Sequence, residues 1–520
     1  MRPSAVAELQ ERVACHNHQH SFWDRLPTEL IIEIFVYGMV APVPPGIRPV
    51  EMKFNLAISH VSRRLRKIAI TTQSLWSQIY FREADVRHRW SRLCLERADK
   101  APVDIHLEIT LERGWRGLPS KPEFDEVLAI VMKHVSHWRT VSMIAERFCP
   151  LHMFLGDFVD AGTAPMLESL SLVYTHPLGR PLRPTAVMQQ IMGGDPISLA
   201  QNMAPRLREL ALVGIHLTWE SFSFRNLTHL HLSHHQPAVQ PTVAEFHSIL
   251  ETSPDLQVLK LNGGSGPFRD EPLSPDASSV DFEAIKLNSL RYLELTFFRS
   301  AARISLLMQL IRAPNLVTLR LEDWFEGNFD SVVQNLGNVL YGYTSVKHLD
   351  MRGIEGTSSR AFYALLEGMR DVETLTITCN DKPRNHSVSC LIPPPDEFGH
   401  PRIPVVMPNL IEFASTGVAP EDITTMLEAR MNARKPLQKL RVNQFDKVRR
   451  FECPLLYGLI CPPFRQVAPK YIEHFRQMVN ELEFFYLRPG EEDPLAEDPE
   501  DRVYSSEAST GDDSSSAETD

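Results

Sequence analysis

The sequence lacks the features that mark membrane-spanning and secreted proteins. Its 520 residues contain no apolar run near the ~18 residues of a membrane-spanning helix. Residues 1–20 are polar and lack the apolar core of a secretion signal. The seven cysteines are scattered, with no CxxC pair, as expected of free thiols in a reducing compartment. We therefore expect the chain in the cytoplasm, the nucleus or both.

An excess of basic residues is also missing. The formal net charge is −11, and residues 491–520 alone, with twelve acidic residues and one Arg, account for all of it. The first 490 residues are balanced, so the body lacks the basic footprint of a nucleic-acid-binding protein. The acidic segment has almost no aliphatic residues and is expected to be a disordered tail. We expect neither nucleic acid nor a membrane as a partner.

Motifs of catalysis are absent as well. There is no P-loop and no GxSxG, and the stretch 263–266 (GGSG) lacks the Lys and helix start of a phosphate cradle. A hydrolase-type α/β enzyme is one alternative, but it would need a Ser, a His and an acid in a shared pocket, and no nucleophile context is present. We expect no enzymatic activity and no cofactor.

Histidines gather at 16–20 and at 229–235. His229 and His231 would point the same way from a strand and could share a metal ion. No second ligand pair at metal-site spacing accompanies them, so exposed polar histidines are the alternative, and we expect no metal site.

Three short segments near the N-terminus carry apolar residues at helical spacing: 26–35, 58–69 and 74–79. Pro27 suits the first turn of the first helix. Steps of three and four recur in the apolar residues of all three segments. These residues are Leu26, Leu30, Ile31, Ile34 and Phe35; Ile58, Val61, Leu65 and Ile68; and Leu75, Trp76 and Ile79. In the second segment, basic residues at 63, 64, 66 and 67 take the other helix face. So small a unit cannot bury all this surface alone, which predicts a docking surface.

The motifs of these segments, LPTEL at 26–30, VSRR at 61–64 and SLW at 74–76, resemble the F-box family in the order of that family. A Pro-rich insert at 40–49, expected to be a loop, separates the first two segments. The resemblance implies a helical module that binds the Skp adaptor of SCF-type ubiquitin ligases, and through it a cullin core. The adaptor-binding residues it implies are Leu26, Pro27, Leu30, Ile31, Ile34, Phe35, Val61, Leu65 and Trp76. An ordinary helical hairpin with a chance Leu-Pro is the alternative.

A unit of the form LxxLxL recurs along the rest of the chain and predicts its architecture. Clear copies begin at residues 167, 207, 227, 256, 290 and 316; weaker ones begin at 346, 372, 410 and 437, and a degraded first copy begins at 138. The LxL alternation indicates a short strand with one apolar face. Helix-like stretches at 243–250, 304–311 and 361–366 lie between copies, which favours a parallel sheet with a covering helix layer. The pattern resembles an irregular leucine-rich-repeat solenoid, with a globular α/β domain as the alternative.

These observations divide the chain into six parts. We expect a flexible arm at 1–21, the F-box-like helical module at 22–80, a linker at 81–130, the solenoid at 131–450, a C-terminal helical cap at 451–490 and the disordered tail at 491–520. The predicted fold class is an α/β repeat behind a small all-helical module. Long loops are expected at 178–198, 262–277 and 384–402.

On such a solenoid the residues between and after the leucines of each strand would form a concave face. This face is polar and of mixed sign, which suits a protein partner. The substrate-binding candidates are His229, His231, Lys260, Tyr292, Glu294, Arg320, Glu322, His348, Asp350 and Arg352. Simple solvation of each of these residues is the alternative.

The resemblance implies the substrate-recognition subunit of an SCF-type ligase, which captures an unknown protein for ubiquitin-dependent degradation. The alternative is a non-catalytic leucine-rich-repeat scaffold or signalling adaptor, in which the F-box-like block only caps the solenoid. A cap would bury Leu26, Pro27, Ile31 and Phe35 against the first repeats, whereas a docking module leaves part of that stripe exposed.

Overall fold

The computed structural model describes residues 22–40, 54–81, 88–110, 121–175, 203–215, 217–219, 224–233, 235, 240–262, 283–296, 301–322, 343–353, 359–378, 388, 391, 406–443, 451–452, 460–461 and 469–485. The predicted arm at 1–21, the insert from 41 onward and the acidic tail lie outside these residues. The expected loops at 178–198, 262–277 and 384–402 also lie outside them, except for the single residues 262, 388 and 391.

A 14-stranded sheet runs through the described chain, and its strands follow one another in sequence order. All of its neighbouring strands pair in parallel. The strands are β1 (Gln78–Phe81), β2 (Val103–Ile109), β3 (Trp138–Ala145), β4 (Ser169–Tyr174), β5 (Glu209–Val213), β6 (His229–Ser233), β7 (Val258–Asn262), β9 (Tyr292–Thr296), β11 (Thr318–Glu322), β12 (His348–Arg352), β13 (Thr374–Thr378), β14 (Glu412–Thr416), β15 (Lys439–Asn443) and β18 (Glu481–Phe485).

Two short strand pairs stand apart from this sheet. β8 (Ile285–Lys286) and β10 (Ile311–Arg312) pair in parallel, and β16 (Phe451–Glu452) and β17 (Ile460–Cys461) pair antiparallel.

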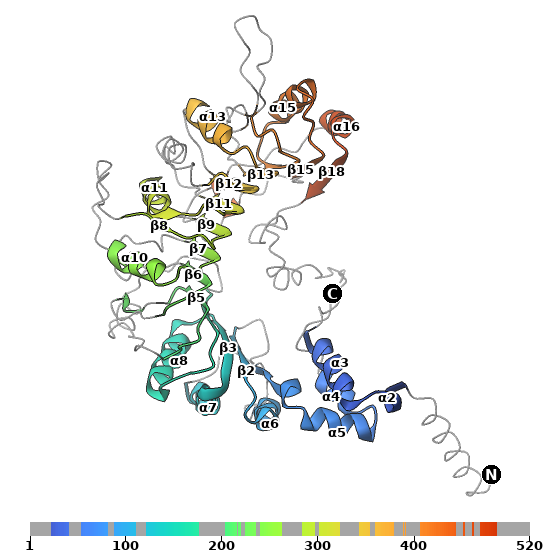
Figure 1. Ribbon diagram of the computed structural model, residues 1–520, viewed down its shortest axis with the longest axis vertical. Coiled ribbons are helices and arrows are strands. Elements are labelled where there is room, and N and C mark those ends of the chain that lie inside the picture. Colours follow the sequence, from blue (N-terminus) through green and yellow to red (C-terminus); the bar gives the residue numbers. More distant parts are fainter. Residues whose placement is uncertain are drawn as a thin grey trace, which may run out of the picture.

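Helices connect the strands and cover one side of the sheet. Figure 1 shows α8, α10, α11 and α13 on the outside of an arc, with the strands along its inside. We call the sheet surface opposite these helices the open face. The helices are α2 (Phe22–Arg25), α3 (Thr28–Val40), α4 (Phe54–Ser59), α5 (Arg63–Thr71), the 3-10 turn η1 (Gln73–Trp76), α6 (Arg89–Ala98), α7 (Lys121–Met132), the 3-10 turn η2 (Val135–His137), α8 (Phe148–Ala161), α10 (Val243–Glu251), α11 (Ala301–Leu310), α13 (Ser359–Gly368), α15 (Pro420–Asn432) and α16 (Pro469–Met478).

Alternation of leucines with polar residues decides which way each strand faces. In β7, Leu259 and Leu261 are fully buried while Lys260 between them is half-buried on the open face. Leu259 pairs in register with Leu230 of β6 and Leu293 of β9, so leucines from successive repeats stack beneath the helices. This burial of one strand face drives the array together. The predicted α/β repeat of leucine-rich-repeat type is confirmed.

The segment at 81–130, predicted to be a linker, belongs in part to the sheet. β2 lies between β1 and β3 and pairs with both. Its residues Ile105, Leu107 and Ile109 are buried, because they alternate with polar residues as in the later repeats. The same segment contains the helix α6.

The segment at 451–490, predicted to be a helical cap, is only partly helical. α16 ends at Met478, and residues 481–485 add the strand β18 to β15. The spacing of Leu482 and Phe485 after Phe475 imitates a helix, but the alternation of Glu481, Leu482, Glu483 and Phe484 is that of a strand.

The N-terminal helical block differs from the prediction in two details. The expected single helix over 58–69 is interrupted: α4 ends at Ser59, and Ser62 caps α5 by accepting a hydrogen bond from the Leu65 amide at 3.2 Å. A serine hydroxyl at this position satisfies an amide that the helix leaves unpaired. Ile79, expected on the third helix, instead lies in β1.

Candidate functional site

One row of side chains crosses the centre of the open face. The sheet register aligns His231, Lys260, Glu294, Arg320 and Asp350 on five successive strands of the sheet, β6, β7, β9, β11 and β12. We call these five residues the charged row. From Lys260 to Asp350 the sign alternates from each strand to the next, and neighbouring parallel strands lie ~4.8 Å apart. Opposite charges so placed across strands attract one another.

Glu294 is the most deeply buried member of the charged row, with 7% of its surface exposed. It accepts a hydrogen bond of 2.7 Å from the Tyr292 hydroxyl, and the Lys260 ammonium lies 5.2 Å from the centre of the Tyr292 ring. Burial tends to raise the pKa of Glu294, but Arg320 and the Tyr292 hydroxyl outweigh burial and lower it. Glu294 is therefore held as a carboxylate within the face.

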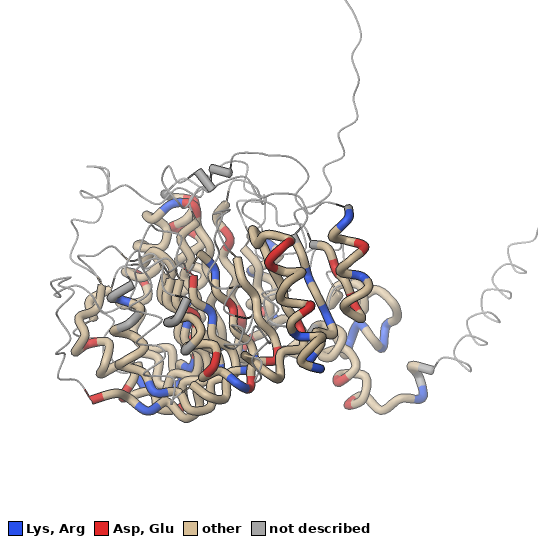
Figure 2. Tube along the Cα trace, turned by 90° about the horizontal axis from the view of Figure 1, so that it is seen from above, with Lys and Arg blue, Asp and Glu red and all other residues tan. Residues whose placement is uncertain are grey.

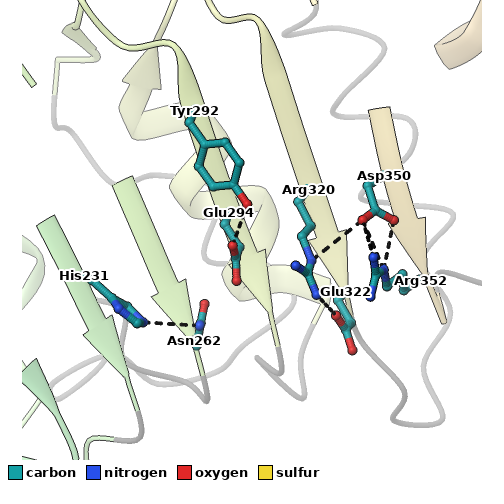
Figure 3. A network of polar contacts seen from close by, with 8 residues as sticks. All are labelled: His231, Asn262, Tyr292, Glu294, Arg320, Glu322, Asp350 and Arg352. Carbon is teal, nitrogen blue, oxygen red and sulfur yellow. Dashed lines mark hydrogen bonds and ion pairs between the residues drawn. The ribbon is translucent and has the colours of Figure 1, made fainter. Parts of the chain in front are cut away.

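Arg320 and Arg352 are bound by the carboxylates beside them (Figure 3). The Arg320 guanidinium lies 3.1 Å from Glu322 and 3.8 Å from Asp350, while Arg352 donates to Asp350 at 2.8–3.0 Å. Burial opposes the charge of Arg320, but the carboxylates around it, beginning with Glu294, raise its pKa above the ordinary value. The guanidinium groups are thus fixed in direction as well as in charge.

The three histidines predicted for this face make fewer contacts. The His231 ring, at the β6 end of the charged row, is 3.4 Å from the Asn262 amide. His229 lies 3.9 Å from Glu209, and His348 is exposed at the start of β12. The structure thus joins Tyr292, Glu294 and the four charged residues from 320 to 352 into one network.

A second charged cluster on the open face was not predicted. Lys439 lies 3.2 Å from Glu481 and 3.0 Å from Glu483, and Arg441 lies 3.1 Å from Glu483 and 3.5 Å from Glu412. These residues come from β14, β15 and β18. The repeat copies at 410 and 437 predict β14 and β15, so their polar positions could have identified the charged residues on these two strands. The residues of β18 carry no repeat copy and fall within the predicted helical cap.

Both clusters pair cations with acids, and Figure 2 shows Lys and Arg interspersed with Asp and Glu along the described chain. A surface of this kind discriminates between partners by matching alternating charges rather than by attracting one sign. Its residues are held by their neighbours and need little reordering on binding.

A hollow of about 780 Å³ lies beside the N-terminal ends of strands β12, β13, β14, β15 and β18. Lys347, Glu373, Arg434, Gln438 and Asn480 are among its lining residues. Lys347 donates to Glu373 at 2.8 Å at the rim. Its mixed polar lining resembles the open face, not the largely apolar lining of small-molecule sites.

The helical block presents a separate, apolar surface. Ile31 and Phe35 are buried in the common core together with Leu65 and Trp76. On the same helix Leu30 is 45% and Ile34 is 42% exposed. The predicted single stripe is therefore split into a buried half and an exposed half.

The remaining adaptor-binding candidates divide in the same way. Leu26 is half-buried, Pro27 is exposed, and Val61 is 65% exposed because it lies in the turn between α4 and α5. Arg64, expected on the solvent face, instead donates to the backbone oxygens of Trp23 and Leu26, both at 2.7 Å. Arg64 thereby fixes the chain that enters α3.

The helical block is joined to the sheet through Trp76. Its indole donates to the Ala69 oxygen at 2.7 Å, its ring centre lies 5.9 Å from that of Trp90, and the Arg97 guanidinium lies 4.1 Å above it. Trp90 and Arg97 belong to α6, which follows β1. Ile31 and Phe35 contact the block itself, since α3 packs on α4, α5 and η1.

Among the described residues, no group of three or more His, Cys, Asp or Glu side chains is placed to hold a metal ion. None of the described helices has the length and apolar character to cross a membrane.

No protein-family model matches the chain, and no curated protein is similar to it. Among solved structures, the leucine-rich repeat-containing protein LegL7 from Legionella pneumophila is similar at 11% identity and a TM-score of 0.30, covering 68% of this chain and 95% of that one.

Proposed function

We propose that this chain is the substrate-recognition subunit of an SCF-type ubiquitin ligase. The helical block would bind a Skp-type adaptor and through it a cullin core, and the open face would hold the protein to be degraded. The chain itself would do no chemistry; its contribution would be to bring two other proteins together. It would act in the cytoplasm, the nucleus or both.

The observation that carries the proposal is the exposed half of α3. Leu30 and Ile34 keep nearly half of their surface in contact with solvent although Ile31 and Phe35 on the same helix are fully buried. A cap that only closed the solenoid would have buried Pro27 as well, and Pro27 is exposed. An apolar helix face left uncovered beside a folded core is the kind of surface that binds a partner.

A pull-down of purified Skp adaptor by the full chain tests the proposal. The variant Leu30→Asp/Ile34→Asp should fold, because both side chains are largely exposed, but should lose the adaptor. Covering half of a Leu or Ile contributes about 1 kcal/mol, and a carboxylate trapped in the interface costs more. We therefore expect binding at least about 100-fold weaker than that of the unmodified chain.

The chain offers a closely matched control. Ile411 and Met431 are 40% and 45% exposed and lie at the other end of the sheet. The variant Ile411→Asp/Met431→Asp should bind the adaptor as the unmodified chain does. If the unmodified chain itself binds no adaptor, the proposal is wrong and the scaffold interpretation replaces it.

A further inference from the structure

The two ends of the sheet differ in how they are covered. At the first end, β1 adjoins the helical block and α6. At the last end, β18 pairs with β15 on one side, and no other strand among the described residues pairs with its outer edge. The Glu481 amide donates to the Gln438 oxygen of the β15 side at 2.9 Å. Since backbone groups alternate along a strand, those of Leu482 and Phe484 point to the outer edge.

The side chains of β18 continue an alternation of charge across the open face. Glu412 on β14 is followed by Lys439 and Arg441 on β15, and these by Glu481 and Glu483 on β18. Each cation has acids on both sides, but the two acids of β18 have a cation on one side only. Their side chains are 62% and 40% exposed. A strand added at this edge would place its own alternate side chains beside them.

The opposite face of β18 is apolar and incompletely covered. Leu482 and Phe484 pack against the common core but remain half-buried. α16 packs on this side of β18. Apolar side chains of an added strand would cover them further, as each repeat covers the one before it.

From these three observations we propose that the outer edge of β18 binds an extended segment of a partner protein in which Lys or Arg alternates with apolar residues. Backbone hydrogen bonds to Leu482 and Phe484 would hold the segment, and Glu481 and Glu483 would select its basic residues. This proposal concerns a different surface from the adaptor-binding one and does not depend on it.

Other occupants fit less well. Two copies of β18 paired edge to edge about a twofold axis, with a continuous open face, would set glutamates of one copy against glutamates of the other. Residues 491–520 of the chain carry a net charge of −11 and would be repelled by the same two acids. A basic, alternating segment is the complement that remains.

Fluorescence anisotropy of labelled peptides with the full chain tests the proposal. The probe is the blocked peptide Lys-Val-Lys-Val-Lys-Val, compared with Lys-Lys-Lys-Val-Val-Val, which has the same composition without the alternation. The alternating peptide should bind and should slow hydrogen exchange at the amides of Leu482 and Phe484. Equal binding of both peptides would reveal charge attraction alone and would overturn the proposal, as would no binding.

A pair of variants locates the site. Glu481→Gln/Glu483→Gln should weaken binding of the alternating peptide about ten-fold, the combined effect of two cross-strand charge pairs. Glu428→Gln/Glu473→Gln changes the charge equally on α15 and α16, where both side chains are exposed, and should leave binding unchanged. Equal losses in the two variants would contradict the proposal. If sedimentation showed a dimer of the chain, and Glu481→Gln/Glu483→Gln increased the fraction of dimer, the edge would be assigned to a second copy instead.

Discussion

The central carboxylate of the charged row gives the most direct test of the electrostatics of the open face. Replacing Glu294 with Gln keeps the shape of the side chain and an oxygen that can accept the Tyr292 hydroxyl at 2.7 Å. It removes a charge that is 7% exposed and faces Arg320. We expect Glu294→Gln to lower the free energy of unfolding near neutral pH.

The size of this loss in unfolding free energy depends on the contacts that the new side chain and its neighbours retain in the Glu294→Gln variant. A hydrogen bond to a charged group contributes about 1.5–3 kcal/mol, and removing one partner of a buried ion pair costs about 3–5 kcal/mol. Gln retains the hydrogen bond, and Arg320 retains Glu322 and Asp350 at 3.1 and 3.8 Å. The expected loss is therefore near the low end, about 2 kcal/mol.

The pH dependence of this loss identifies its cause. Because the folded protein lowers the pKa of Glu294 below 4.5, its charge stabilises the fold above that pH. The stabilisation disappears as the pH falls through the lowered pKa, whereas Gln does not titrate. The difference between the two proteins should be largest at about pH 7 and should shrink at about pH 3.

Urea unfolding of both proteins at the two pH values provides the measurement. Glu428→Gln, which removes a half-exposed carboxylate on α15, serves as the control and should change little. A difference that stays the same in acid would show that packing, not charge, makes Glu294 important. A variant as stable as the unmodified chain at neutral pH would refute the argument altogether.

Two further substitutions test other parts of the structure. Trp76→Phe removes the 2.7 Å hydrogen bond to the Ala69 oxygen. Hydrogen exchange in α5 should become faster by the equivalent of about 1–2 kcal/mol, while exchange in β9 and β11 should not change. Equal acceleration in all three elements would contradict a local role of Trp76. Arg430 is fully buried, donates to three backbone oxygens between residues 406 and 410, and has its pKa lowered by burial to about 10. Arg430→Met recovers about 3 kcal/mol of that burial cost but loses three hydrogen bonds to a charged group, about 1.5–3 kcal/mol each. Its thermal midpoint should therefore fall, and a rise would contradict this balance.

The sequence predicts the repeat array well because one physical pattern decides it. Each LxxLxL copy, from Leu167 to Leu437, begins two residues before a strand of the sheet and continues into that strand. The residue between the last two apolar positions of the copy faces away from the core. The pattern also identifies the side chains of the open face. It does not say which of them bind one another, because the pairing of Arg320 with Asp350 depends on the register of β11 against β12. That register follows from leucine packing throughout the array.

Prediction is weaker where two periods overlap or where exposure depends on neighbours. The sequence does not predict β18, because Phe475, Met478, Leu482 and Phe485 recur at helical spacing. The alternation of polar and apolar residues over 481–484, which is typical of a strand, overlaps with that spacing. The spacing along α3 places Leu30 and Ile31 on one stripe, but only Ile31 reaches the core against α4, α5 and η1. Periodicity gives the apolar stripe, and the width of the packed surface decides which half is covered.

The arrangement of the two proposed partner surfaces has a mechanical consequence. Trp76 packs against α6 and so holds the helical block at one end of the sheet, and the outer edge of β18 forms the other end. Fourteen parallel strands at ~4.8 Å place these ends about 60 Å apart along the sheet, and each strand is hydrogen-bonded to its neighbours. A packed sheet holds two bound partners at a fixed separation. A flexible linker does not, and the effective concentration of one partner near the other falls as the linker grows longer. A partner held on the open face or at β18 would therefore be presented at a fixed distance and direction from whatever binds α3 (Figure 1). Such rigidity would suit the proposed role, in which the chain acts by proximity alone, because a bound partner that moved freely would lose the gain in local concentration.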